Sequence, residues 1–265
     1  MTGDQGGAGA PSTTGQAVAV TRAGLSRPRS ADGDGDSQER LCAGMRISPL
    51  DEMRPALAAR TRFFDRQVMK MISAGIGQIV VVGAGYDDRA LRFRTRGVTY
   101  YEVDHPSTQY DKVRRLLAIQ ARTERLVHVA ADFRRDAVSS ALASVGHDAL
   151  SASLFMCEGL LVYLDQATIV TLLGSLRACA APGSTLAASL AIHHDDVASG
   201  DKVLAAANAR RKTGRTEPWR TILPAEAHLE LLGRSRWQVD SVEDAAELEE
   251  GVAEGRSLLV TARPG

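Results

Sequence analysis

The stretch QIVVVGAGYDDRA, residues 78–90, joins an apolar run to a glycine turn. Such a run leading into Gly-Ala-Gly is typical of a buried parallel strand that ends beside a ligand. A dinucleotide-binding fingerprint would place a third glycine at position 88, where this chain has Asp88, preceded by Asp87. Glycine lets the backbone approach a ligand closely, so the stretch predicts a ligand-binding turn followed by two carboxylates.

Outward from this turn, short apolar runs alternate with helical segments. Near-continuous apolar strands separated by helices indicate a parallel sheet that is covered on both faces. Strands are expected at 78–82, 98–103, 126–131, 152–158, 185–191, 237–242 and 256–263. Helices are expected at 53–73, 106–122, 164–180 and 224–232. The predicted fold class is therefore α/β, a doubly wound and mostly parallel seven-stranded sheet preceded by N-terminal helices.

The composition limits the kinds of partner. Lys+Arg and Asp+Glu both total 32, so no net field attracts nucleic acid or an anionic membrane. No run approaches the roughly 20 apolar residues that a membrane helix needs. The three scattered cysteines fit a reduced compartment. We expect a cytoplasmic protein with neither a nucleic-acid nor a membrane partner, and a homodimer is left open.

Three regions are predicted along the chain. Residues 1–40, rich in Gly, Ser, Thr and Asp, are expected to form a flexible N-terminal segment, and 41–265 one domain. Residues 193–220 break the strand–helix rhythm and are predicted as a helical lid, with a pair of surface helices as an equal alternative. The HHDD run at 193–196 is not expected to bind metal, because adjacent ligands on one segment rarely close a tetrahedral site.

Acidic residues stand at the ends of three further predicted strands. Asp104 lies about 20 residues beyond the glycines, where an acid accepts hydrogen bonds from the ribose hydroxyls of an adenosine group. Asp132 is placed to accept from the adenine amino group, with Phe133 packed on the ring. Glu158 is expected where the donor and the acceptor of a transferred group meet.

The carboxylates after the glycine turn favour a cationic ligand. A pyrophosphate would lie near Asp87, and like charges in a poorly solvated cleft repel each other by several kcal/mol. S-adenosyl-L-methionine has an adenosine for Asp104, no phosphate, and both an ammonium and a sulfonium. The turn therefore suits this methyl donor better than NAD.

The motifs QIVVVGAGYDDRALRF, YYEVDHP, AADFRRD and CEGLLVYL resemble the leucine carboxyl methyltransferase family, including its bacterial, tetracenomycin-type polyketide O-methyltransferase branch. The resemblance runs from about residue 54 to the end and implies a class I, Rossmann-like methyltransferase with S-adenosyl-L-methionine as donor and S-adenosyl-L-homocysteine as product. By matched motif, Arg60 pairs with the methionine carboxylate. The expected donor-binding residues are Arg60, Gly83, Ala84, Gly85, Asp87, Asp104, His105, Asp132, Phe133 and Glu158.

Two positions depart from the family pattern. The family usually has a threonine where this chain has Asp88, and a Gly-Trp pair where it has Arg236-Trp237. The sequence suggests no role for Asp88.

The predicted reaction is O-methylation of a carboxylate of a small molecule, such as a specialised metabolite, or of a peptide C-terminus. A carboxylate is ionised near pH 7 and needs no general base, whereas a phenol or other hydroxyl needs one. Tyr163 and His193 are the candidates for further catalytic roles. The remaining alternatives are a non-catalytic partner protein that binds the donor and, least favoured, an NAD-dependent oxidoreductase.

Overall fold

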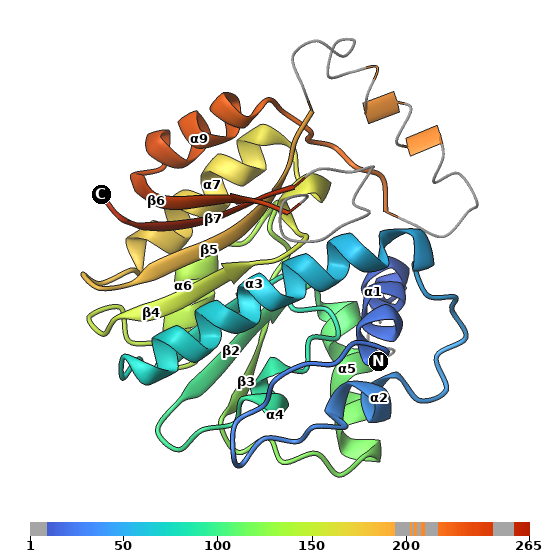
Figure 1. The fold of residues 1–265 in the computed structure, drawn as a ribbon. Coiled ribbons are helices and arrows are strands. Elements are labelled where there is room, and N and C mark those ends of the chain that lie inside the picture. Colours follow the sequence, from blue (N-terminus) through green and yellow to red (C-terminus); the bar gives the residue numbers. More distant parts are fainter. Residues whose placement is uncertain (1–9, 194–201, 203, 206–207, 210–216, 246–256) are drawn as a thin grey trace, which may run out of the picture.

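The computed structural model describes residues 10–193, 202, 204–205, 208–209, 217–245 and 257–265. One seven-stranded sheet with the order β3-β2-β1-β4-β5-β7-β6 runs through it (Figure 1). The strands are β1 (Gln78–Val82), β2 (Thr99–Asp104), β3 (Leu126–Ala130), β4 (Ser153–Cys157), β5 (Thr185–Ala191), β6 (Trp237–Asp244) and β7 (Ser257–Pro264). Strands β1 to β5 are parallel, and β7 pairs antiparallel with both β5 and β6. The predicted α/β fold with a mostly parallel seven-stranded sheet is confirmed.

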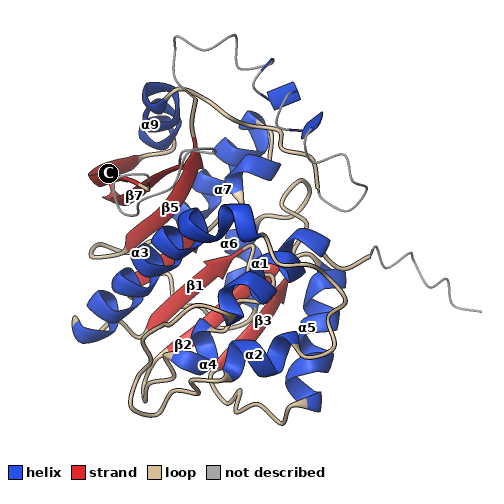
Figure 2. Ribbon diagram, turned by 45° about the vertical axis from the view of Figure 1, so that its right-hand side comes forward, coloured by secondary structure: helices blue, strands red, loops and turns tan. Residues whose placement is uncertain are grey.

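Helices cover both faces of the sheet (Figure 2). Their bounds are α1 (Thr13–Ala23), α2 (Ser37–Cys42), α3 (Arg54–Ser73), α4 (Arg89–Arg92), α5 (Pro106–Ala118), α6 (Val138–Ser144), α7 (Gln166–Ala178) and α9 (Ala225–Arg234). Helix α3 packs on one face in an apolar cluster that includes Phe63 and Phe64. Helices α6, α7 and α9 pack on the other face, around Phe155 and Trp237. Every residue of β1 is buried, which explains its unbroken apolar sequence.

Each predicted strand and each of the four predicted helices is present, with ends shifted by a few residues. The short helices α4 and α6 were not predicted. Helix α4 has four residues, and two of them are the buried arginines Arg89 and Arg92, so it carries no apolar periodicity. The position of β7 between β5 and β6 was not predicted either, because strand order is set by long-range pairing.

The N-terminal segment predicted to be flexible, residues 1–40, includes helix α1 and the first part of α2. Helix α1 packs on α2 and α3, and the predicted boundary at residue 40 falls inside α2. A small core joins these helices to the glycine turn and to α5; its buried members are Ala19, Leu41, Tyr86, Leu91 and Leu116. Most of the predicted lid, including residues 194–201 and 210–216, lies outside the described residues. Among the helices described, none is long and apolar enough to cross a membrane.

The departure at Arg236 has a local consequence. Arg236 follows the end of α9 with a φ of +60°, a conformation that favours glycine over residues with a Cβ. Its side chain is exposed. Replacing Arg236 with glycine is therefore expected to raise the free energy of unfolding by roughly 0.5–1 kcal/mol, measured by urea denaturation.

Arg234, two residues earlier in the last turn of α9, is the matched control. Glycine at a helical position lowers stability by roughly 0.5–1 kcal/mol, so Arg234→Gly should have the opposite sign. A loss of stability in Arg236→Gly would contradict the assignment of strain to this residue.

Candidate active site

The glycine turn lies at the carboxyl edge of the sheet, between β1 and α4. Gly83 and Gly85 have φ values of +69° and +49°, which explains why glycine occupies both positions. The N–H groups of Gly83 and Ala84 donate to the carbonyl of Val103 on β2, at 2.8 and 3.2 Å. A Cβ on Gly83 would lie 2.9 Å from the side chain of Leu160, so this face of the turn has no spare room.

Asp104 ends β2 beside this turn. Its carboxylate accepts hydrogen bonds from the backbone N–H of Gly85 and, at 2.6 Å, from that of His105. Burial raises the pKa of Asp104, and these two N–H donors oppose the rise. Each carboxylate oxygen keeps a second lone pair, so Asp104 can still accept from a pair of ribose hydroxyls.

Five arginines and four carboxylates form a cluster behind the turn, which we call the arginine–carboxylate cluster. Its members are Arg22, Arg27, Arg60, Arg89, Arg92, Asp65, Asp87, Asp88 and Glu158. When all are ionised, the cluster has one positive charge in excess. Charges with so little access to water stay ionised only when they are paired, and this network pairs them.

Glu158 is the carboxylate of the cluster that contacts three arginines. Arg22 binds it closely, Arg60 donates to it at 3.0 Å, and Arg89 at 2.7 Å. Burial raises the pKa of Glu158, but the three guanidinium groups outweigh burial and hold it well below its usual range. The structure thus brings Arg60 and Glu158, both predicted donor residues, into direct contact.

Arginines neutralise the charge of the Asp87 carboxylate, which the sequence argument did not take into account. Its carboxylate binds the side chain of Arg89, accepts from the Arg89 backbone N–H at 2.7 Å, and lies 3.6 Å from Arg22. The repulsion of a phosphate by Asp87 is therefore reduced by these arginines. The structure therefore weakens the argument from Asp87 for a cationic ligand, since the cluster around it has one positive charge in excess.

Asp88, which had no predicted role, holds the N-terminal segment. Arg27 and Ser37 donate to its carboxylate at 2.7 and 2.9 Å, and Arg92 reaches it at 3.4 Å. Burial opposes ionisation, but the charges of Arg92 and Arg27 lower the pKa of Asp88 to about 2. Asp88 is thus a structural counterion that fastens the loop between α1 and α2 to α4.

Three other predicted donor residues have local roles. Asp132 accepts from the backbone N–H of Arg134 at 3.1 Å. Phe133 is partly buried and packs against the core on the side of α6 and α7. His105 caps the N-terminus of α5, and its Nδ1 lies 2.8 Å from the Ser107 hydroxyl. The binding of the donor by these three residues remains a prediction.

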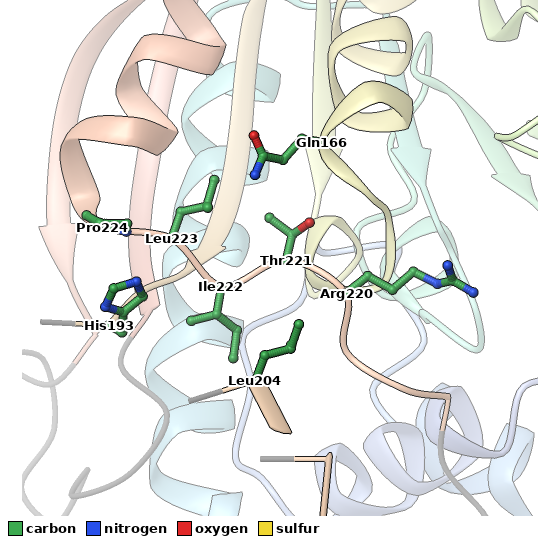
Figure 3. A pocket seen from close by; sticks show the side chains of 8 residues that line it. All are labelled: Gln166, His193, Leu204, Arg220, Thr221, Ile222, Leu223 and Pro224. Carbon is green, nitrogen blue, oxygen red and sulfur yellow. The ribbon is translucent and has the colours of Figure 1, made fainter. Parts of the chain in front are cut away.

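A cavity of about 380 Å³ lies at the carboxyl end of β5. Figure 3 shows His193 and Arg220 at opposite ends of it, with apolar side chains between them. Its lining residues are Gln166, His193, Leu204, Arg220, Thr221, Ile222, Leu223 and Pro224. Tyr163, the other candidate for a catalytic role, is not among them and is half-buried in the short helix η2 (Leu161–Tyr163).

The segment after Glu158 connects this cavity to the glycine turn. The backbone N–H groups of Arg220 and Thr221 donate to the carbonyl of Val162, at 2.7 and 3.2 Å. The Thr221 hydroxyl donates to the carbonyl of Leu164 at 2.6 Å. Since Leu160 lies against Gly83, the stretch 160–164 borders both the donor turn and the cavity wall.

Sequence reasoning missed the participation of Arg22 and Arg89. Arg22 comes from α1, more than 60 residues before the turn, and only the fold brings it to Glu158. Arg89 forms ion pairs with Asp65 and Asp87. The one signal that could have pointed to Arg89 is its position directly after two acids.

The residues present fit S-adenosyl-L-methionine. The excess positive charge of the cluster matches the methionine carboxylate, and the buried Nε of Arg22 makes no hydrogen bond with the described residues. Asp104 has lone pairs for the ribose, and α1 passes over the turn, with a Cβ on Gly85 3.8 Å from the Cα of Gly15. The Glu158 carboxylate would bind the donor ammonium beside Arg22, which already donates to it.

Comparisons with known proteins agree with this fit. A provisionally named methyltransferase of Thermobifida fusca YX shares the fold, with a TM-score of 0.62 over 96% of this chain and 95% of that one, at 17% sequence identity. The magnesium protoporphyrin IX methyltransferase of Synechocystis PCC 6803, solved with S-adenosyl-L-homocysteine, has a TM-score of 0.53 over 86% and 93%, at 11% identity. The fold is that of the class I methyltransferases.

The model of the leucine carboxyl methyltransferase family matches residues 19–177, and the chain belongs to this family. A provisionally named S-adenosyl-L-methionine-dependent methyltransferase of Mycolicibacterium gilvum is 39% identical over 139 residues, which are 51% of this chain and 44% of the relative. The chain spans about half the length of the curated relatives it matches.

Proposed function

We propose that this chain transfers a methyl group from S-adenosyl-L-methionine to a carboxylate of a small molecule or a peptide C-terminus. The family and the fit of the cluster support the donor. The observation that carries the choice of a carboxylate is the cavity with Arg220 at one end, joined to the donor turn by the stretch that follows Glu158. A guanidinium binds a carboxylate through charge-assisted, often bidentate hydrogen bonds.

The donor supplies a methyl group made electrophilic by its sulfonium. Arg22 and Arg60 would hold the methionine carboxylate, Glu158 the amino group and Asp104 the ribose. The acceptor carboxylate attacks in line with the breaking carbon–sulfur bond, and a methyl ester forms while the positive charge leaves the sulfur. A carboxylate with an ordinary pKa near 4 is already ionised, so the protein aligns the reactants and excludes water.

Arg220 is expected to determine acceptor affinity. Replacing it with methionine removes the cation and should raise KM for a carboxylate acceptor roughly 10- to 100-fold, the value of a charge-assisted hydrogen bond of about 1.5–3 kcal/mol. The measurement is methyl transfer from radiolabelled donor, with acceptors identified by a screen of carboxylic acids and peptides. Affinity for S-adenosyl-L-homocysteine should stay unchanged, because Arg220 lies outside the cluster.

Arg234→Met, on the exposed side of α9, is the control and should leave KM unchanged. The product of a carboxylate acceptor releases its methyl group in mild base, because it is an ester. An unchanged KM in Arg220→Met, or a base-stable product, would exclude the proposed acceptor class.

A hydroxyl acceptor is the second candidate, and the observation that favours it is the placement of His193 in the same cavity. A phenol with an ordinary pKa near 10 needs a base, and an imidazole can supply one. In that case His193→Ala would lower kcat, and the product would be a base-stable ether.

A further inference from the structure

A buried lysine on α5 contacts the backbone of the glycine turn. The Nζ of Lys112 donates to the main-chain carbonyl of Asp87 at 2.7 Å and to the carboxylate of Glu102 at 2.6 Å. Lys112 and Glu102 are each 1% exposed. A lysine this deeply buried needs a structural or functional reason, since its charge has left water.

An ion pair with Glu102 explains one contact of Lys112, but it does not explain the hydrogen bond to the carbonyl of Asp87. Burial raises the pKa of Glu102 to about 7, and the charge of Lys112 opposes the rise. His128 lies 3.7 Å from the same carboxylate, but burial and then Lys112 lower its pKa to about 4, so its ring is neutral near pH 7. Lys112 is therefore the counterion of Glu102. The second hydrogen bond of Lys112, to the carbonyl of Asp87 in the turn, is not part of that ion pair.

The first half of the turn is held by β2, and the second half also receives a hydrogen bond from Gln38 on α2 to the carbonyl of Tyr86, at 3.0 Å. Gly83 and Ala84 donate to Val103, and Gly85 donates to Asp104, so β2 fixes these three residues. The residues after Gly85 must place the side chain of Asp87 in the arginine–carboxylate cluster. The bond from Lys112 is made to the carbonyl of that same residue.

We infer that Lys112 is a positioning residue, which holds the second half of the glycine turn so that the turn and the Asp87 carboxylate keep the geometry that the methyl donor requires. Lys112 does not touch the donor; it acts through the Asp87 carbonyl. The inference rests on the proposed donor site and adds a residue of α5 to it.

The experiment separates this role from simple neutralisation of Glu102. Lys112→Met removes both contacts and is expected to weaken binding of S-adenosyl-L-homocysteine about tenfold, measured by calorimetry. It also leaves Glu102 buried and unpaired, which can unfold the protein. The double variant Lys112→Met/Glu102→Leu removes both charges, so its thermal stability should recover while its affinity stays about tenfold weaker.

Two further variants complete the design. Glu102→Gln keeps the bond from Lys112 to the turn and should bind S-adenosyl-L-homocysteine within about twofold of the wild type. Arg114→Met changes an exposed cation on the same helix and should change nothing. Amide hydrogen exchange of residues 83–87 should be faster in the double variant, while exchange in β4 and β5 stays as in the wild type.

Recovery of affinity in the double variant, or an equal loss in Glu102→Gln, would assign the effect to the ion pair and overturn the inference. So would unchanged exchange of residues 83–87. If the wild type itself does not bind S-adenosyl-L-homocysteine, the proposed function fails; binding by the wild type and equally by the double variant refutes only the role of Lys112.

Discussion

Replacing Asp104 with alanine should weaken binding of S-adenosyl-L-homocysteine at least about 100-fold, because two hydrogen bonds to a charged acceptor are lost, each of roughly 1.5–3 kcal/mol. A second effect adds to the first. The Asp104 carboxylate also accepts from the N–H of Gly85, so its removal releases the turn itself. Calorimetry on the folded variant measures the loss.

Two aspartates serve as controls for this prediction. Asp240 lies on β6 at the far edge of the sheet and pairs with Arg263, so Asp240→Ala should bind the ligand normally. Asp132→Ala should have a smaller effect than Asp104→Ala, because its carboxylate accepts from the backbone of its own loop and lies near Arg134 and Arg135. Normal affinity in a folded Asp104→Ala variant would show that the ribose site is elsewhere.

Replacing Arg89 with methionine should lower the free energy of unfolding by about 3–5 kcal/mol, as expected when one partner of a buried ion pair is removed. Arg89 is 1% exposed and binds Asp65, Asp87 and Glu158, so its loss leaves three carboxylates short of a counterion. Urea denaturation with circular dichroism as the readout measures the change.

Arg94→Met is the matched control for this variant, because Arg94 is half-buried and its side chain donates to the carbonyl of Asp32 rather than to a carboxylate. It should change stability by less than about 0.5 kcal/mol. A loss below about 1 kcal/mol in Arg89→Met would show that the remaining arginines suffice for the three carboxylates.

The effect of Arg89→Met has a pH dependence of known sign. Burial raises the pKa of Glu158, but Arg22, Arg89 and Arg60 hold it below its ordinary value of 4.5. The stability that comes from this ionised carboxylate is present above pH 4.5 and is lost as the pH falls toward the lowered value. The difference between wild type and variant should therefore shrink in acid.

Local patterns in the sequence predicted the elements and the edge at which the site lies. The apolar run before Gly83 predicted β1, and the glycines predicted a turn, in which Gly83 and Gly85 both have a positive φ. Asp104 ends β2, so its place beside the turn follows from the rule that parallel strands end at one edge. These inferences needed only residues that are near one another along the chain.

The partners of the charged residues could not be predicted in this way. Asp87 and Asp88 are adjacent in the sequence, yet Asp87 joins the group around Glu158 while Asp88 fastens the N-terminal loop through Arg27 and Ser37. Arg22 reaches the site from α1, before the turn in the sequence, and Lys112 from α5, after it.

The sequence by itself determined the α/β fold, the glycine turn and the acids at the strand ends, because periodicity and backbone conformation are local properties. Only the tertiary structure decided which arginine pairs with which carboxylate, and that the turn is held from α5 as well as from β2. Ion pairs in a buried cluster depend on distances between segments far apart in the chain and on the exclusion of water around them. No local pattern records either quantity.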